Sequence, residues 1–72
     1  MHISFTNHVK YRINERGISL LHIEQTLKKP DSNRIGFDGT ILAQKAFAGK
    51  ILEIVYTKNK GRIVVITAYY FD

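Results

Sequence analysis

The feature of this sequence that most constrains its fold is a change of hydrophobic period at Pro30. Before Pro30, apolar residues recur at intervals of three and four, as they do along one face of an α-helix. After Pro30, runs of β-branched and aromatic residues alternate with turn signals, which is typical of strands. A chain that changes period in this way is expected to pack helices against a sheet, so the α+β class is predicted.

Two helices are predicted before Pro30. Either Thr6 or Asn7 can cap the first helix, because a short side-chain oxygen satisfies free backbone N–H groups, and Gly17 ends it. Ser19 caps the second helix and Pro30 stops it. The apolar stripes of the two helices are Phe5, Val9 and Ile13, followed by Leu20, Ile23 and Leu27.

Strands are predicted over the rest of the chain, with turn residues between them. A weak strand at 34–37 is followed by strands at 40–47, 50–57 and 62–71, separated by Asp38-Gly39, Ala48-Gly49 and 58–61. The expected architecture is two N-terminal helices packed on a four-stranded, or at least three-stranded, antiparallel β-sheet. With 72 residues, the chain is expected to be a single domain over residues 1–72.

The last two predicted strands have two faces of different character. If the turn pairs Thr57 with Arg62, the helix-covered face carries Leu52, Ile54, Tyr56, Ile63, Val65, Thr67 and Tyr69. The opposite face then carries Val55, Val64, Ile66, Ala68 and Tyr70, and it is more apolar than a solvated sheet face should be. We therefore expect a partner on that face, either a second copy of the chain in a homodimer or a segment of another protein.

The composition excludes several kinds of site. There is no cysteine, so disulfides and thiolate zinc sites are excluded. His2, His8 and His22 do not have the spacing of a metal site, and no metal or cofactor is expected. No apolar run approaches the roughly 18 residues of a membrane span, and MHISFTNHVK lacks the apolar core of a signal peptide. These features are consistent with a cytoplasmic protein.

The charge is strongly basic, with eleven Lys and Arg against six Asp and Glu, a net charge of +5. This excess has two interpretations of equal weight: a polyanion partner such as RNA, or solubility alone. Lys10 and three residues around the last turn, Lys58, Lys60 and Arg62, are the candidate nucleic-acid contacts. A basic hairpin tip of this kind is also common as a simple solvated turn.

The strongest local pattern is His8-x-x-x-Arg12-x-x-Glu15-Arg16. RNA cleavage without a metal needs a base, a cation for the phosphorane charge and an acid. His8 can be the base or acid, Arg12 and Arg16 can hold the phosphate, and Tyr69 or Tyr56 can stack on a base or supply a proton.

The same pattern has a structural interpretation that stays open. Glu15 can pair with Arg12 or Arg16 within the helix, and His8 can cap or pack. Arg16 can donate to strand carbonyls. For the tyrosines, packing in the core and sheet is the favoured role.

These residues carry a resemblance to a known family. HVKYRINERGIS near the start and ILEIVYTKNKGRIVVITAYY near the end resemble a family of short prokaryotic domains of unknown function, over about residues 8–70. The family pattern is H-x-x-x-R-x-x-x-R-G-I, then V-V-T-A-Y. The chain matches it at His8, Arg12, Arg16, Gly17, Thr67 and Tyr69.

That family is similar in layout to the RelE, ParE and BrnT toxins, and the resemblance implies a ribonuclease-like fold group. The first hypothesis is a toxin-like basic protein that acts on RNA, in its sharper form a metal-independent endoribonuclease with His8, Arg12, Arg16 and Tyr69 as catalytic residues. Its partners would be RNA and a cognate antitoxin. The alternative hypothesis is a non-catalytic module that binds nucleic acid or protein.

Overall fold

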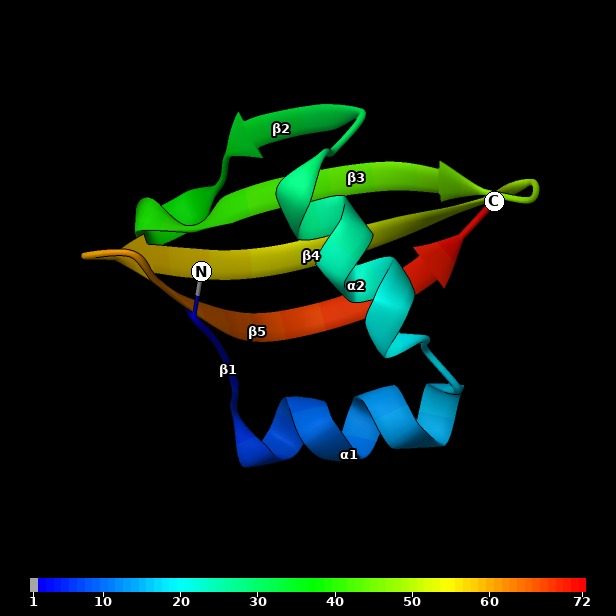
Figure 1. Ribbon diagram of the computed structural model, residues 1–72, viewed down its shortest axis with the longest axis horizontal. Helices are drawn as coiled ribbons and strands as arrows, with labels where there is room; N and C mark the ends of the chain where they lie inside the picture. Colours follow the sequence, from blue (N-terminus) through cyan, green and yellow to red (C-terminus); the bar gives the residue numbers. More distant parts are fainter. Residues whose placement is uncertain (1) are drawn as a thin grey trace.

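Five strands form one sheet, and two helices lie between the first and second strands of the chain (Figure 1). The computed structural model describes residues 2–72. The elements are β1 (His2–Phe5), α1 (Asn7–Arg16), α2 (Leu20–Lys28), β2 (Ser32–Ile35), the 3-10 turn η1 (Phe37–Gly39), β3 (Ile41–Phe47), β4 (Lys50–Asn59) and β5 (Arg62–Phe71). The strand order across the sheet is β1-β5-β4-β3-β2. The α+β class is confirmed.

The prediction of a four-stranded antiparallel sheet is wrong, because a strand precedes the helices. β1 pairs parallel to β5, with Ile3 opposite Ile63 and Phe5 opposite Val65, so the sheet is five-stranded and mixed. The sequence signal was too short to show this strand. β1 has only two apolar residues, and Phe5 fits the helical spacing of Val9 and Ile13 equally well. β5 therefore pairs with β4 on one side and, over residues 62–65, with β1 on the other.

Both helices begin and end where their capping residues predict. Thr6, and not Asn7, caps α1: its Oγ1 accepts the backbone N–H of Val9 at 3.1 Å. Gly17 ends α1 with a left-handed φ of 65°, a conformation that other residues adopt at a cost. Ser19 caps α2, because its Oγ accepts the N–H of His22 at 3.2 Å.

The helices cover one face of the sheet. α2 crosses in front of the central strands, and α1 lies along the side of β5 (Figure 1). The core between these layers is made of Val9, Ile13, Ile18, Ile23, Leu27, Ala43, Leu52, Ile54, Tyr56, Ile63, Val65 and Ala68. The other face of the sheet has no helix over it, and we call it the open face.

The turn between β4 and β5 is tighter than predicted. Asn59 pairs with Arg62, and the two residues between them, Lys60 and Gly61, both have left-handed φ angles of 52° and 78°. This is the backbone of a two-residue hairpin turn, which matches the twist of the flanking strands. The predicted pairing of Thr57 with Arg62 was off by two residues. Because side chains alternate with a period of two, the faces near the turn were still assigned correctly.

A β-bulge corrects the predicted faces farther along β5. Tyr56 pairs with Val65 and Val55 pairs with Thr67, so Ile66 is an extra residue on β5. Beyond this residue the alternation changes phase.

Ala68 and Tyr70, predicted to lie on the open face, lie under the helices, with Ala68 fully buried and Tyr70 packed on the core. Thr67 and Tyr69, predicted to lie under the helices, lie on the open face, in register with Val55 and Glu53. Strict alternation in the sequence cannot reveal such a bulge.

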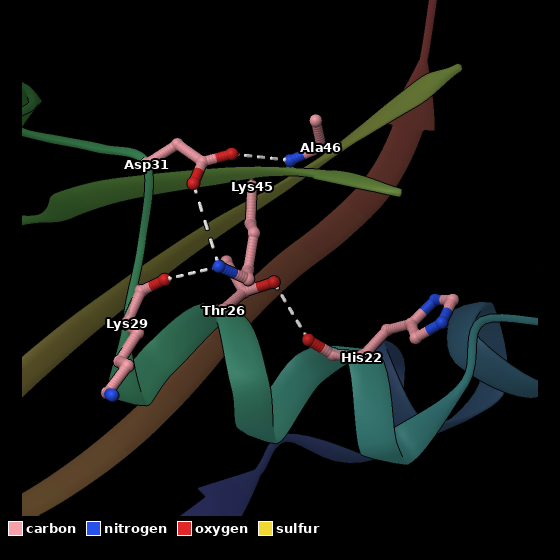
Figure 2. A network of polar contacts seen from close by, with 6 residues as sticks. All are labelled: His22, Thr26, Lys29, Asp31, Lys45 and Ala46. Atoms are coloured by element: carbon pink, nitrogen blue, oxygen red, sulfur yellow. Dashed lines mark hydrogen bonds and ion pairs between the residues drawn. The ribbon is translucent and has the colours of Figure 1, made fainter. Parts of the chain in front are cut away.

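The strand after α2 also begins earlier than predicted. β2 covers Ser32–Ile35 in place of 34–37, and Phe37 belongs to the turn η1. Figure 2 shows how the start of this segment is held. Asp31 accepts the backbone N–H of Ala46 at 2.9 Å, and Lys45 Nζ lies 3.6 Å from the Asp31 carboxylate and donates to the carbonyl of Lys29 at 2.9 Å. The end of α2 and the edge strand are therefore both tied to β3.

Candidate functional site

The cationic group predicted on α1 is spread along the helix and does not form one cluster. Arg12 Nη1 lies 3.4 Å from Glu15 Oε1, an exposed pair within one helical turn. Such pairs contribute at most about 1 kcal/mol, so Arg12 remains available to solvent. His8 is exposed one helical turn before Arg12.

Arg16 reaches in another direction and joins α1 to the sheet. Its Nη1 donates to the backbone carbonyl of Ala68 at 3.0 Å. This is the contact that the structural interpretation of Arg16 predicts, a donor for a strand carbonyl. β1 pairs with β5 only over residues 62–65, so Ala68 lies past the end of that pairing. Arg16 supplies a hydrogen-bond donor to its carbonyl there.

Tyr69 is separated from the α1 group by its place on the open face. Its hydroxyl donates to Glu53 Oε2, a carboxylate on the neighbouring strand β4. The phenol therefore points toward β4, whereas Arg16 approaches β5 from α1. The four predicted catalytic residues are not brought together around one point, and Tyr56, the alternative tyrosine, is buried in the core.

Glu53 is the centre of a polar cluster that sequence analysis did not identify. It is only 5% exposed although it belongs to the open face. Gln44 Nε2 donates to its Oε1 at 2.6 Å, and Tyr69 donates to its Oε2. One signal in the sequence points to this residue: Glu53 is the only acid within the strand-forming run 50–57.

The hydrogen bond to Glu53 raises the pKa of Tyr69 above its usual value of 10.0. Partial burial and the negative charge of Glu53 act in the same direction, and the nearby Arg34 guanidinium opposes them. A phenol in this setting is protonated at neutral pH and serves as a hydrogen-bond donor. Both oxygens of Glu53 accept hydrogen bonds, so the cluster holds its carboxylate in place.

The open face combines aromatic and cationic side chains around this covered carboxylate. The rings of Tyr69 and Phe71 lie 5.9 Å apart at an angle of 38°, and Phe71 is 36% exposed. Arg34 on β2 and Arg62 on β5 share the face by register, Arg34 opposite Leu42 and Arg62 opposite Asn59. Within the described residues, Glu53 is the only acid in strands β2, β3, β4 and β5.

The predicted nucleic-acid contacts divide among three places. Lys60 and Arg62 line a hollow of about 400 Å³ on the open face, together with Thr57, Asn59 and Val64. Lys58 is in register with the buried Ile63 and so belongs to the helix-covered side. Lys10 lines a separate hollow of about 460 Å³ between the helices. Lys60 and Arg62 are therefore the two of these cations that share one site.

Two further features concern metals and membranes. No group of three or more His, Asp or Glu side chains in residues 2–72 is placed to hold a metal ion. None of the described helices has the length and apolar character needed to cross a membrane.

The sequence matches a known family over most of its length. A family described as "Domain of unknown function (DUF4258)" matches residues 5–70, which is nearly the whole chain. The chain belongs to the DUF4258 family. Its match runs from the end of β1 to Tyr70, so this DUF4258 domain includes both helices and the covered carboxylate Glu53. No curated protein and no solved structure significantly matches this chain.

Proposed function

We propose that this DUF4258 domain binds single-stranded RNA on its open face. The observation that carries the proposal is the neighbouring aromatic pair Tyr69 and Phe71 on a sheet face that also holds Arg34, Lys60 and Arg62. The single acid of that face, Glu53, is covered and hydrogen-bonded.

The chemistry of single-stranded RNA suits such a surface. Unpaired bases stack on aromatic side chains, and cations track the phosphates. An open sheet face offers both kinds of contact on a rigid support, because each side chain is held at a fixed register position. The net charge of +5 would draw a polyanion to the domain.

The substitution Phe71→Ala tests the aromatic part of this proposal. Loss of one base–aromatic stack is expected to cost about 1–3 kcal/mol of binding free energy, roughly a 5- to 150-fold weaker Kd. Binding of a fluorescent oligouridylate, followed by anisotropy, measures it. Phe37→Ala is the matched control, because Phe37 is 90% exposed in η1 and has no place on the four strands of the open face. Equal effects of the two substitutions would contradict the assignment of the open face.

In a sharper form of the proposal, the domain is a toxin-like ribonuclease whose catalytic residues lie on α1. It rests on the resemblance to the RelE, ParE and BrnT toxins and on the exposed positions of His8 and Arg12. Induced expression should then inhibit growth, and His8→Ala or Arg12→Ala should relieve the inhibition while circular dichroism shows an intact fold. The same purified proteins should differ in RNA cleavage without added metal. Equal toxicity of wild type and folded variants would reject a ribonuclease centred on these residues.

A protein-binding function is the second candidate, and the exposed Ile66 favours it. Ile66 is 38% exposed and is the extra residue at the bulge of β5, between Val65, which pairs with Tyr56, and Thr67, which pairs with Val55. Val55 and Val64 are half-buried apolar residues of the open face. A second copy of the chain or a cognate antitoxin would cover this apolar part of the open face. Ile66→Lys should then weaken self-association in sedimentation experiments and leave secondary structure in place. A wild-type chain that stays monomeric at high micromolar concentration would exclude the homodimer.

A further inference from the structure

We infer that the hollow beside the β4–β5 turn binds a backbone phosphate of the RNA. This hollow, lined by Thr57, Asn59, Lys60, Arg62 and Val64, has a volume of about 400 Å³. The inference rests on the proposed function and names the part of the ligand that this end of the open face would hold.

The side chains around the hollow suit a phosphate group. A guanidinium can donate two parallel hydrogen bonds to phosphate oxygens, and an ammonium adds a compact positive charge. Thr57 and Asn59 supply a hydroxyl and an amide, both of which can donate to the remaining oxygens. Among residues 2–72, no acid lines the hollow. In the described part of the chain, neither Lys60 nor Arg62 takes part in an ion pair.

The hollow is built on paired strands, which fix the positions of its walls. Asn59 and Arg62 face each other across the two-residue turn, and Thr57 lies opposite Val64 on the same face. On its other side, Arg62 is in register with His2 of β1, so strands flank it on both sides. Such a site loses less conformational entropy on binding than a flexible loop with the same residues.

The position of the hollow relates it to the aromatic pair. Arg62 and Phe71 are the first and last residues of β5, and both belong to the open face. At about 3.3 Å per residue, they lie roughly 30 Å apart along the strand. A strand of RNA that follows β5 can therefore place one phosphate in the hollow while a base several nucleotides away stacks on Phe71.

The test is the salt dependence of RNA binding. Each phosphate contact in a single-stranded complex contributes about 0.7 to the slope of log K against log salt concentration. We expect the double substitution Lys60→Gln/Arg62→Gln to weaken binding of a fluorescent oligouridylate and to reduce this slope by about 0.7, the contribution of the one phosphate that the two cations hold together. Lys28→Gln/Lys29→Gln is the control, because it removes the same charge from the α2 end of the molecule, on the helix-covered side. Its slope should remain close to that of wild type.

A second measurement is independent of RNA. In NMR titrations with inorganic phosphate, the amide signals of residues 59–62 should shift in the wild-type chain and remain fixed in the double variant.

The outcomes separate the inference from the function on which it rests. RNA binding with an unchanged slope in the double variant would overturn the phosphate site and leave RNA binding by the open face intact. An equal fall of the slope in the control would also overturn it, because the effect would then follow net charge alone. Absence of RNA binding by the wild-type chain would overturn both.

Discussion

Glu53 is a carboxylate that the protein buries on a face without helices, and two hydrogen bonds make this burial possible. Gln44 and Tyr69 each donate to one of its oxygens. A buried carboxylate without such partners would be strongly destabilising. The cluster therefore fixes the position of Tyr69 and, through it, the aromatic surface of the open face.

Tyr69→Phe should destabilise the fold by about 1–3 kcal/mol, because it leaves one oxygen of a buried carboxylate without a donor. Chemical denaturation at pH 7 measures the change. Tyr11→Phe is the control, since Tyr11 is 64% exposed on α1. A Tyr69→Phe variant as stable as wild type would show that the hydrogen bond to Glu53 contributes nothing.

The raised pKa of Tyr69 adds a pH dependence to this prediction. A group whose pKa is higher in the folded state stabilises the fold below its unfolded pKa, near 10, and the contribution disappears as the pH rises through the folded value. The difference in stability between wild type and Tyr69→Phe should therefore be constant below about pH 10 and shrink above it.

At the scale of elements, the segment from α2 to β2 is held by Asp31 and Lys45. The hydrogen bond from the backbone N–H of Ala46 on β3 is the main cause that lowers the pKa of the Asp31 carboxyl below 3.8. Desolvation opposes it, and the charge and hydrogen bond of Lys45 add to the lowering. The edge strand β2, whose residues are all exposed, depends on such polar contacts more than on buried apolar surface.

Asp31→Ala should therefore reduce stability at neutral pH. A group with a lowered folded pKa stabilises the fold above its unfolded pKa, and the contribution is lost as the pH falls through the lower folded value. The two proteins should thus differ most above about pH 4 and converge in strong acid, as thermal unfolding at a series of pH values would show. Asp72→Ala, at the exposed last residue, is the control. A difference that persists below pH 2 would contradict the role of the charged carboxylate.

At the scale of the whole molecule, the first strand closes the fold. β1 covers the side of β5 near the β4–β5 turn, and its residues Ile3 and Phe5 pack against the core from the helix-covered side. A domain of 72 residues buries a small core, and its total stability is on the order of 4–11 kcal/mol. A contribution from two half-buried side chains is large on that scale.

Ile3→Ala/Phe5→Ala should accordingly lower the free energy of unfolding by about 3 kcal/mol or more, since each substitution leaves a partial cavity in the core. Urea denaturation measures this value. His2→Ala/Ser4→Ala changes the alternate residues of the same strand, whose side chains belong to the open face, and should change stability by less than about 0.5 kcal/mol. Similar losses in the two double variants would contradict a specific contribution of the Ile3 and Phe5 side chains to the core.

Sequence alone determined the features that depend on neighbouring residues. The caps Thr6 and Ser19, the helix end at Gly17, the left-handed turn residues and the two long strands are each encoded within a few positions. A side-chain oxygen satisfies an N–H three residues away, and a glycine relieves strain in its own backbone, so local rules are sufficient for these features. The resemblance to a family of unknown function was likewise carried by local motifs.

Only the tertiary structure decided which residues meet across the sheet. The parallel pairing of β1 with β5, the bulge at Ile66 that moves Tyr69 to the open face, and the contact of Glu53 with Gln44 and Tyr69 all join residues distant in sequence. Arg16 likewise found its acceptor, the Ala68 carbonyl, 52 positions away. Strand register depends on the packing of both faces at once, and one extra residue reverses the side chains that follow. The candidate site therefore differs from the sequence prediction because its geometry arises from pairing between strands, which no local pattern encodes.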